Sequence, residues 1–179
     1  MGFRIRPSQI ADTDALGRVH SRSWHESYTG IIAPQILATA GSVERRTAIR
    51  RDMFAHSTPQ WGHFLVETND GEIVGFGDCG PARDQVKDFA DAEIYTLYLL
   101  RTAQGCGLGR LLLKQMFDHL YKQGFTKTAL KTHAGSLQAN QFYAHLGGHK
   151  VSEIKSPDWN ENVYLWSDLK GFGEKAGPA

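Results

Sequence analysis

Residues 93–122 read EIYTLYLLRTAQGCGLGRLLLKQMFDHLYK, and the rest of the chain can be interpreted outward from them. Residues 93–100 are rich in leucine, aromatic and β-branched side chains and carry one charge, Glu93, which is typical of a central strand covered on both faces. Three glycines follow within positions 105–109. Over residues 110–122 apolar side chains recur every three or four positions, which predicts a helix.

A glycine loop between a strand and a helix is suited to binding an anion. The first helical turn has N–H groups without internal acceptors, and glycine lets the backbone approach a ligand closely. A Walker A loop needs Lys and then Ser or Thr after its last glycine, where this chain has Arg110-Leu111. A dinucleotide fingerprint beginning at Gly105 needs a glycine at its sixth position, which is also Arg110. An ordinary glycine-rich turn stays open as the alternative.

What remains is Gln104-x-x-Gly107-x-Gly109, and here the chain resembles the GNAT superfamily of acetyl-coenzyme A-dependent N-acetyltransferases. The signature of that family is Arg or Gln, two residues, Gly, one residue, and Gly or Ala, behind an apolar strand and at the opening of a helix. The resemblance implies that the backbone of the loop holds the pyrophosphate of coenzyme A. The residues implied in this contact are Gln104, Gly105, Cys106, Gly107, Leu108, Gly109 and Arg110.

A second stretch, residues 140–147, resembles the family's other signature in compressed form. Asn140 and Tyr143 are three positions apart and therefore share one face of a predicted helix. The resemblance implies that Asn140 contacts the pantetheine arm or the phosphates, and that Tyr143 donates a proton to the coenzyme sulfur. The alternatives are a solvated helix residue for Asn140 and a core aromatic for Tyr143. Gly148-His149 stands where the family usually has Gly-Phe.

The flanking patterns predict an α/β protein with a mixed, mostly antiparallel sheet. Helical spacing predicts helices that begin near Asp12, Pro34 and Ser136, the second of which restarts after Gly41. The predicted order is β-α-α-β-β-β-α-β-α-β-β, with about six or seven strands, about four helices, and a parallel crossover through the glycine-loop helix. The GNAT resemblance implies the same fold. Apolar or alternating runs predict further strands at 3–7, 63–68, 72–79, 126–132, 149–154 and 163–168.

Length and composition predict one domain over residues 1–170 with a flexible tail at 171–179. The net charge of +1 gives no overall attraction to nucleic acid or membranes. No apolar run approaches the ~20 residues that span a bilayer, and no secretion signal is visible. The two cysteines lack the spacing of a disulfide framework, which favours the cytoplasm, and the eight histidines do not form a metal site. Edge strands near the C-terminus permit a homodimer.

Glu93 is the candidate general base. An amine with a pKa near ~10.4 is almost entirely protonated at neutral pH, so an acetyl transfer to it needs a base, directly or through water. Glu93 is the only acid in the central strand, and it precedes Gln104 by the spacing of the catalytic Glu in histone acetyltransferase members of the family. The alternative is a strand-end carboxylate in water or in an ion pair.

The resemblance also implies contacts by the end of the central strand. The backbone of Leu97, Tyr98 and Leu99 would pair with the amides of pantetheine like an added strand, although a plain core strand is the alternative. Trp24 and Tyr28 are four apart on the first predicted helix, a region from which the family often builds the acceptor pocket. Core packing of these two aromatics is the alternative.

Arg45, Arg46, Arg50 and Arg51 form a basic stripe on the second helical region. A solvated helix face is the simpler interpretation. The functional interpretation is contact with an acidic substrate or with the 3′-phosphate of the coenzyme.

We therefore expect an N-acetyltransferase that moves an acetyl group from acetyl-coenzyme A to a primary amine of a small molecule or peptide by direct attack in a ternary complex. The rival is a non-catalytic acyl-coenzyme A sensor on the same fold, because a fold alone does not guarantee activity. A nucleotide-binding domain is a weaker rival, since neither phosphate fingerprint fits. The sequence does not identify the acceptor amine.

Overall fold

The computed structural model describes residues 2–157 and 159–173, and it confirms a mixed α/β fold. Within these residues seven strands form one sheet in the order β1-β2-β3-β4-β5-β7-β6, so β7 lies between β5 and β6. The strands are β1 (Phe3–Pro7), β2 (Gly62–Thr68), β3 (Ile73–Pro81), β4 (Ala92–Leu99), β5 (Thr128–His133), β6 (His149–Ile154) and β7 (Glu161–Trp166). The helices are α1 (Thr13–Tyr28), α2 (Pro34–Ala40), α3 (Val43–Ala55), α4 (Leu108–Lys122) and α5 (Leu137–His145).

The strand pairing follows the predicted mixed pattern. β4 runs parallel to β5, with Ala92–Ile94 beside Thr128–Leu130, and α4 forms the connection between them. The β1–β2, β5–β7 and β6–β7 pairs are antiparallel. The predicted crossover is thus confirmed as parallel. The helical region that begins at Pro34 restarts after Gly41, as the sequence predicts, and forms α2 and α3. The described residues therefore contain five α-helices, where about four were expected.

The chain divides into two compact units, each with its own packing. The first unit holds residues 2–59, 63–77 and 96–112, and the second holds residues 60–62, 78–95, 113–157 and 159–173. The boundary passes through β3, β4 and α4. The single domain expected from the length stays a prediction.

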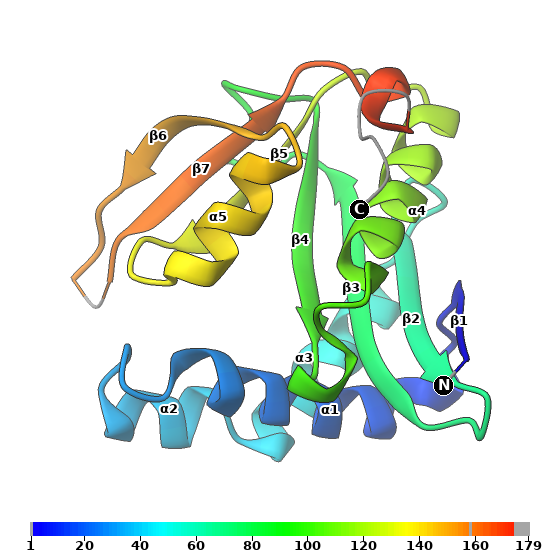
Figure 1. The fold of residues 1–179 in the computed structure, drawn as a ribbon, viewed down its shortest axis with the longest axis vertical. Coiled ribbons are helices and arrows are strands. Elements are labelled where there is room, and N and C mark those ends of the chain that lie inside the picture. The colour runs from blue at the N-terminus through cyan, green and yellow to red at the C-terminus, as the bar shows by residue number, and fades with distance from the viewer. Residues whose placement is uncertain (1, 158, 174–179) are drawn as a thin grey trace. The chain divides into compact units, whose positions relative to one another are not determined.

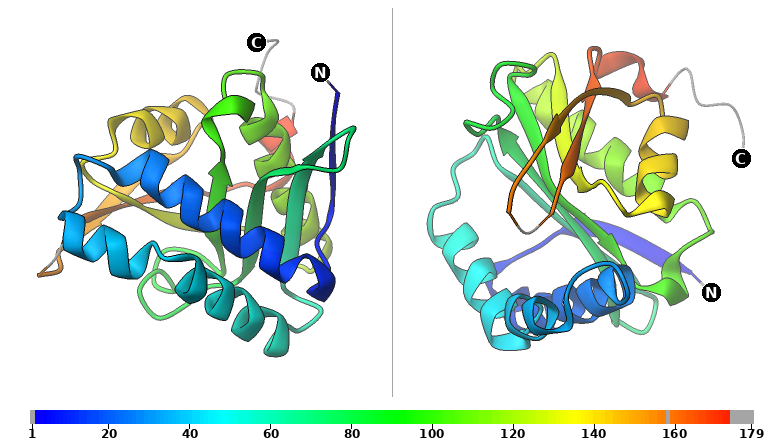
Figure 2. Two further views of the ribbon diagram at one scale, coloured as in Figure 1. Left: turned by 90° about the horizontal axis from the view of Figure 1, so that it is seen from below. Right: turned by 90° about the vertical axis from the view of Figure 1, so that its left-hand side faces the viewer.

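In the first unit, α1 and α3 pack side by side (Figure 2). Gly17 lies at the point of closest approach, because a Cβ added there would sit 2.0 Å from Thr47 Oγ1 and 2.9 Å from Thr47 Cα. Ser42 accepts a hydrogen bond from the backbone N–H of Arg45 at 3.3 Å and so caps the start of α3. The buried residues of α1 include Leu16, Val19 and His20.

In the second unit, a short segment at residues 170–173 packs onto an aromatic side chain of α4. Lys170–Gly173 forms a short 3-10 helix, and Phe172 is buried with its ring 4.5 Å from that of Phe117. The tail predicted from residue 171 does not begin there, because Phe172 has an apolar partner. The rest of the predicted tail, residues 174–179, lies outside the described residues.

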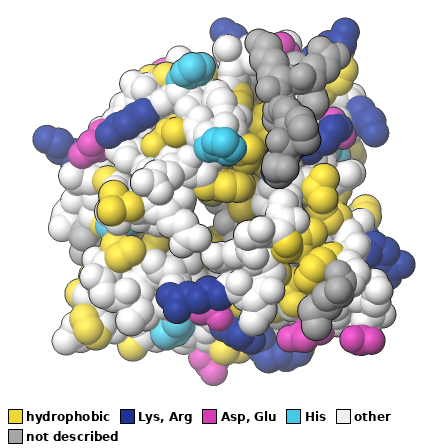
Figure 3. Space-filling view, viewed as in Figure 1, with side chains coloured by type: hydrophobic (Ala, Val, Ile, Leu, Met, Phe, Trp, Pro, Cys, Tyr) yellow, Lys and Arg dark blue, Asp and Glu magenta, His cyan; other side chains and the backbone are white. Residues whose placement is uncertain are grey.

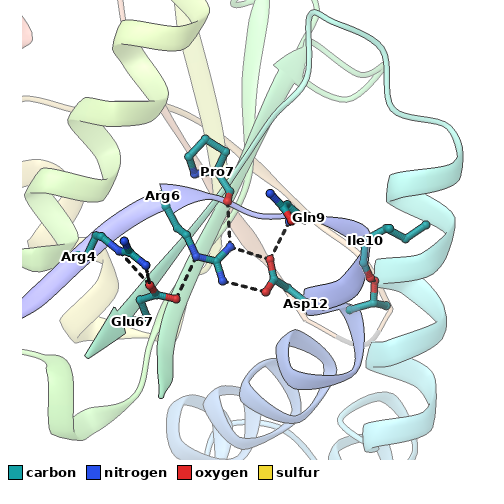
Figure 4. Close-up of polar contacts among 8 residues, drawn as sticks. Arg4, Arg6, Pro7, Gln9, Ile10, Asp12 and Glu67 are labelled. Atoms are coloured by element: carbon teal, nitrogen blue, oxygen red, sulfur yellow. Dashed lines mark hydrogen bonds and ion pairs between the residues drawn. The ribbon is translucent and has the colours of Figure 1, made fainter. Parts of the chain in front are cut away.

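A network of charged side chains fastens β1 to β2 and to the start of α1 (Figure 4). The carboxylate of Glu67 is buried and accepts hydrogen bonds from Arg4 Nε at 2.9 Å and Arg6 Nε at 3.0 Å. Arg6 also donates both terminal nitrogens to Asp12, at 2.8 and 2.9 Å. Asp12, a predicted cap of α1, makes no side-chain cap bond and accepts the backbone N–H of Gln9 instead.

This network makes part of the stability depend on pH. The pKa of Glu67 is lowered below its usual range, mainly by the hydrogen bond from Arg4. The pKa of Asp12 is also lowered, mainly by the hydrogen bond from Arg6. A carboxylate with a lowered pKa stabilises the fold above its ordinary pKa, and that contribution is lost as the pH falls through the folded pKa. Glu67→Gln should therefore lower the stability at pH 7 by about 2 kcal/mol. In thermal unfolding, the difference in stability from the unaltered protein should shrink as the pH falls below the ordinary pKa of a glutamate. A difference that stays constant with pH would contradict this account.

On the face shown in Figure 3, charged side chains lie mainly near the edge of the view, where several Lys and Arg side chains lie next to Asp and Glu. Among the described residues, no helix is long and apolar enough to cross a membrane. No group of three or more potential metal ligands occurs within residues 2–157 and 159–173.

Candidate functional site

The glycine loop has the backbone geometry of an anion-binding turn. Gly105 and Gly107 adopt φ values of 75° and 81°, a left-handed conformation that favours glycine. A Cβ at either position would meet no atom within 4 Å, so the space beside the backbone is open. Glycine is therefore favoured at these positions by the backbone conformation and not by crowding. The N–H of Leu111 donates to the carbonyl of Gly107 at 3.1 Å. The first turn of a helix directs backbone N–H groups toward its start, which here is the glycine turn. This open, N–H-lined turn fits the oxygens of a phosphate group.

The helix begins earlier than the sequence predicts. α4 starts at Leu108 and not at Arg110, so Gly109 lies in its first turn (Figure 1). The side chain of Leu108 is buried, and this burial fixes the first turn. Gly109 is buried as well, whereas Gly105, Cys106 and Gly107 are exposed.

Side chains on both sides fasten the loop to the rest of the first unit. Gln104, expected at the pyrophosphate, donates its Nε2 to the carbonyl of Leu99 at 2.9 Å, so it closes the loop onto the end of β4. Glu26 accepts the backbone N–H of Arg101 at 2.8 Å, and Arg101 Nη2 donates to the carbonyl of Glu26 at 2.6 Å. The thiol of Cys106 donates to the carbonyl of Ala103 at 3.3 Å. The loop is therefore held in place by residues of α1 and β4.

Trp24 and Tyr28, predicted for the acceptor pocket, contact Tyr98, which was predicted for the coenzyme arm. Trp24 Nε1 donates to the hydroxyl of Tyr98 at 3.1 Å, and the hydroxyl oxygens of Tyr28 and Tyr98 lie 3.2 Å apart. The rings of Trp24 and Tyr28 meet edge to face at 5.1 Å, and the His20 ring lies 5.2 Å from Tyr98. All three predicted residues are partly exposed. Tyr98, expected to act through its backbone, thus also presents its hydroxyl to the two aromatics of α1.

Arg46 was interpreted as part of a solvated stripe, and the structure corrects this. Arg46 and Arg50 are only 7% and 1% exposed, whereas Arg45 and Arg51 are on the surface. The guanidinium carbon of Arg46 lies 3.5 Å from the centroid of the Trp24 ring, and that of Arg50 lies 4.0 Å from the Phe76 ring. The sequence carries no signal for this difference, because only the rotation of the helix decides which two of the four arginines turn inward.

Burial has an electrostatic cost at Arg46. Burial lowers the pKa of Arg46 to about 10 and is the largest cause of this shift. The positive charges of Arg45 and Arg50 lower it further. The nearby phenols of Tyr98 and Tyr28 act in the opposite direction. Its Nε atom is buried and has no hydrogen-bond partner, and no carboxylate within residues 2–157 and 159–173 forms an ion pair with it.

In the second unit, Glu93 is 1% exposed and bound by a single arginine. Arg83 donates Nη2 to Glu93 Oε1 at 2.6 Å and Nε to Oε2 at 2.8 Å, and its backbone N–H reaches Oε2 at 3.2 Å. The same guanidinium lies 4.5 Å from the centroid of the Tyr95 ring. The pairing raises the pKa of Arg83, with the hydrogen bond to Glu93 as the largest cause. The ion pair that the sequence left open as an alternative is therefore what the structure contains, and the base role stays a prediction.

Asn140 belongs to a different hydrogen-bond network from the one expected. Its amide nitrogen donates to the carbonyls of His133 and Ser136 at 3.0 and 2.7 Å, and its oxygen accepts from Asn162 Nδ2 at 2.7 Å and from the Tyr164 hydroxyl at 3.1 Å. The side chain thus joins α5 to the end of β5 and to β7. The alternative of a solvated helix residue is wrong, and contact of this amide with the coenzyme stays a prediction.

Tyr143 lies one helical turn away from Asn140 and is buried among aromatic rings. Its ring centroid lies 6.0 Å from that of Tyr164 and 6.2 Å from that of Trp166, the latter nearly perpendicular. Gly148, which precedes the His149 that departs from the family pattern, packs against Trp166 so closely that a Cβ would lie 2.6 Å from its ring. The ring of Tyr143 is therefore held rigidly.

The strand, the left-handed glycine turn and the helix opening match a known family in sequence as well as geometry. The family model described as the acetyltransferase (GNAT) family matches residues 24–148. The chain belongs to the GNAT acetyltransferase family. The match runs from the C-terminal end of α1 through α5 and so includes both predicted signatures.

Individual GNAT proteins resemble the chain to different degrees. An uncharacterized N-acetyltransferase of Bacillus subtilis, YuaI, is 29% identical over 122 residues, which are 68% of this chain and 66% of that protein. The chain therefore spans about two thirds of the length of that curated relative.

Solved structures confirm the fold. The PaiA N-acetyltransferase of Thermoplasma acidophilum in complex with coenzyme A superimposes with a TM-score of 0.73 at 19% identity, covering 93% of this chain and 99% of that one. The YncA protein of Salmonella typhimurium, a putative acetyltransferase solved with its cofactor acetyl-coenzyme A, has a TM-score of 0.67 at 18% identity, with 100% and 99% coverage. At this identity the likeness establishes a GNAT fold.

Proposed function

We propose that the chain is an N-acetyltransferase that moves the acetyl group of acetyl-coenzyme A to a primary amine by direct attack in a ternary complex. The observation that carries the proposal is the turn at Gly105 and Gly107, whose open N–H groups precede α4 and suit a pyrophosphate. Membership of the GNAT family and the coenzyme complexes of PaiA and YncA support the choice of coenzyme. The cytoplasmic location, the absence of nucleic-acid or membrane partners and a homodimer stay predictions.

The residues have separate proposed roles in binding. The backbone from Gly105 to Arg110 would hold the pyrophosphate, and the backbone of Leu97–Leu99 would pair with the amides of the pantetheine arm. Gln104 would act indirectly, because its side chain already holds the loop against Leu99. Asn140 likewise would position α5 through its bonds to His133 and Ser136.

The chemistry requires one proton to leave the amine and one to reach the sulfur. The amine nitrogen forms a bond to the acetyl carbon, the carbon–sulfur bond breaks, and the thiolate leaves. A backbone N–H near Leu97–Leu99 would donate to the oxyanion that develops. Tyr143 would protonate the thiolate. Glu93 remains the proposed base, although both its oxygens already accept hydrogen bonds from Arg83, so taking up a proton would displace one of these bonds.

The test is release of free thiol from acetyl-coenzyme A in the presence of a panel of primary amines. We expect release that depends on one chemical class of amine, with the acetylated amine detected by mass spectrometry. Tight coenzyme binding in calorimetry without release would favour the non-catalytic sensor. No binding of acetyl-coenzyme A at all would remove the proposed coenzyme site.

A further inference from the structure

The aromatic cluster of Trp24, Tyr28 and Tyr98 contains one cation whose charge no described residue compensates. Arg46 is more than nine-tenths buried, and its Nε has no hydrogen-bond partner. Two other arginines bind carboxylates: Arg6 binds Glu67 and Asp12, and Arg83 binds Glu93. Arg46 stacks only on the face of Trp24.

We propose that the acceptor amine carries an anionic group, a carboxylate or a phosphate, that pairs with Arg46. This inference rests on the proposed acetyl transfer. A buried cation without a partner is unfavourable, and an anion from a bound ligand would neutralise it. The planar guanidinium is also the side chain best shaped to bind such oxygens in a bidentate manner.

The neighbouring groups suit a ligand of this kind. The hydroxyls of Tyr28 and Tyr98 lie 3.2 Å apart, and the indole of Trp24 adds an aromatic wall that carries the guanidinium on its face. Arg50, four positions after Arg46 on α3, places a second positive charge in the same unit. Hydroxyl donors, an aromatic wall and a positive charge would together recognise an amine that has an apolar body and an anionic end.

The cluster lies on the strand predicted to bind the coenzyme arm. Tyr98 stands between Leu97 and Leu99, and its hydroxyl accepts from Trp24. An anionic end held at Arg46 would therefore place the acceptor beside the same strand end. The competing ligand is the 3′-phosphate of the coenzyme itself, which the experiment must separate.

The experiment compares amines in matched pairs that differ in the anion alone. Phenylalanine is paired with phenethylamine, leucine with 3-methylbutylamine, and phosphoethanolamine with ethanolamine. For the best pair, kcat/KM of the member with the carboxylate or phosphate should exceed that of the member without it. Arg46→Met should reduce this ratio about tenfold or more, the size expected for one hydrogen bond to a charged group. Arg46→Lys, which keeps the charge without the planar fork, should retain part of the ratio. Arg45→Met, an exposed arginine on the same helix, should leave the ratio unchanged.

Four results would overturn the proposal. The first is a preference, in every pair, for the amine that lacks the carboxylate or phosphate. The second is a kcat/KM ratio within the best pair that Arg46→Met does not change. The third is a loss confined to KM for acetyl-coenzyme A that disappears with dephospho-acetyl-coenzyme A, because it would assign Arg46 to the 3′-phosphate. The fourth is a lower Tm for Arg46→Met, since a purely structural Arg46 would stabilise the fold, whereas an uncompensated charge predicts an equal or higher Tm.

A binding measurement keeps this test separate from the proposed activity. If no amine releases thiol, the transferase proposal fails, but the same pairs can be titrated by tryptophan fluorescence, because Trp24 lies against Arg46. A change with the anionic members that Trp24→Phe and Arg46→Met both abolish would support the anion site. No difference within any pair would overturn it.

Discussion

Replacing Arg83 with Met should destabilise the protein by about 2–4 kcal/mol, because the change leaves the buried carboxylate of Glu93 without its guanidinium partner. At the size of this chain that loss corresponds to a decrease in Tm of roughly 4–16 °C. The Arg83 side chain is itself 54% exposed, so water can enter as it leaves, which is why we expect less than the loss from a fully buried pair. Thermal and urea unfolding at pH 7 measure the effect.

Two further variants test whether the pair is the cause. Glu93→Gln combined with Arg83→Met should be less destabilised than the sum of the two single changes, since the double variant has no buried unpaired charge. Lys87→Met removes an exposed lysine of the same loop that pairs with Asp84, and it should leave the stability nearly unchanged, because water screens a surface ion pair. If Arg83→Met behaved like Lys87→Met, the ion pair would not support the fold.

Glu93→Gln also separates a structural from a chemical role. Loss of a base should lower kcat and change its dependence on pH while the fold stays intact, whereas loss of a structural partner should mainly lower Tm. A variant with a lower Tm but an unaltered pH–rate profile would leave the ion pair as the function of Glu93.

Tyr143→Phe should lower kcat about 10- to 100-fold, near the lower end of the contribution of a general acid. The KM for acetyl-coenzyme A should stay within about twofold, because the substitution keeps the ring that binding and packing use. The substitution keeps the ring that packs against Tyr164 and Trp166, so we expect the variant to fold. Steady-state kinetics with the best amine of the panel provide the measurement.

The matched control is Tyr121→Phe, which removes the hydroxyl of an exposed tyrosine on α4. Its kcat should equal that of the unaltered protein. An unchanged kcat in Tyr143→Phe would exclude Tyr143 as the acid, and a parallel loss of kcat and secondary structure would mean that its hydroxyl supports the fold.

The strand–loop–helix could be predicted because local physics determines it. An apolar run, glycines that reach positive φ and a helical period lie within one stretch, and each signal is readable without tertiary information. The start of α4 at Leu108 could not be placed to the residue, because burial of that side chain depends on the tertiary packing. Trp24, Tyr28 and Tyr98 were each identified, but their contact depends on how α1 lies against β4.

The electrostatic partners were beyond prediction for the same reason. Arg83 lies in a polar loop that showed no pattern, ten positions before Glu93, and only the fold brings the two together. Asn140 was read as a ligand contact, although four of its bonds reach His133, Ser136, Asn162 and Tyr164 within the protein. Arg46 differs from its exposed neighbour Arg45 only in the face of α3 that it occupies.

The cysteine in the glycine turn provides a single site for chemical labelling. Cys106 is exposed beside Gly105 and Gly107, whereas Cys79, the other of the two cysteines, is fully buried, and its burial raises the pKa of its thiol. A maleimide dye would therefore attach to one position without any engineering of the sequence. Such a dye would sit on the turn itself, so that its fluorescence and its rate of attachment would both report when the turn is covered.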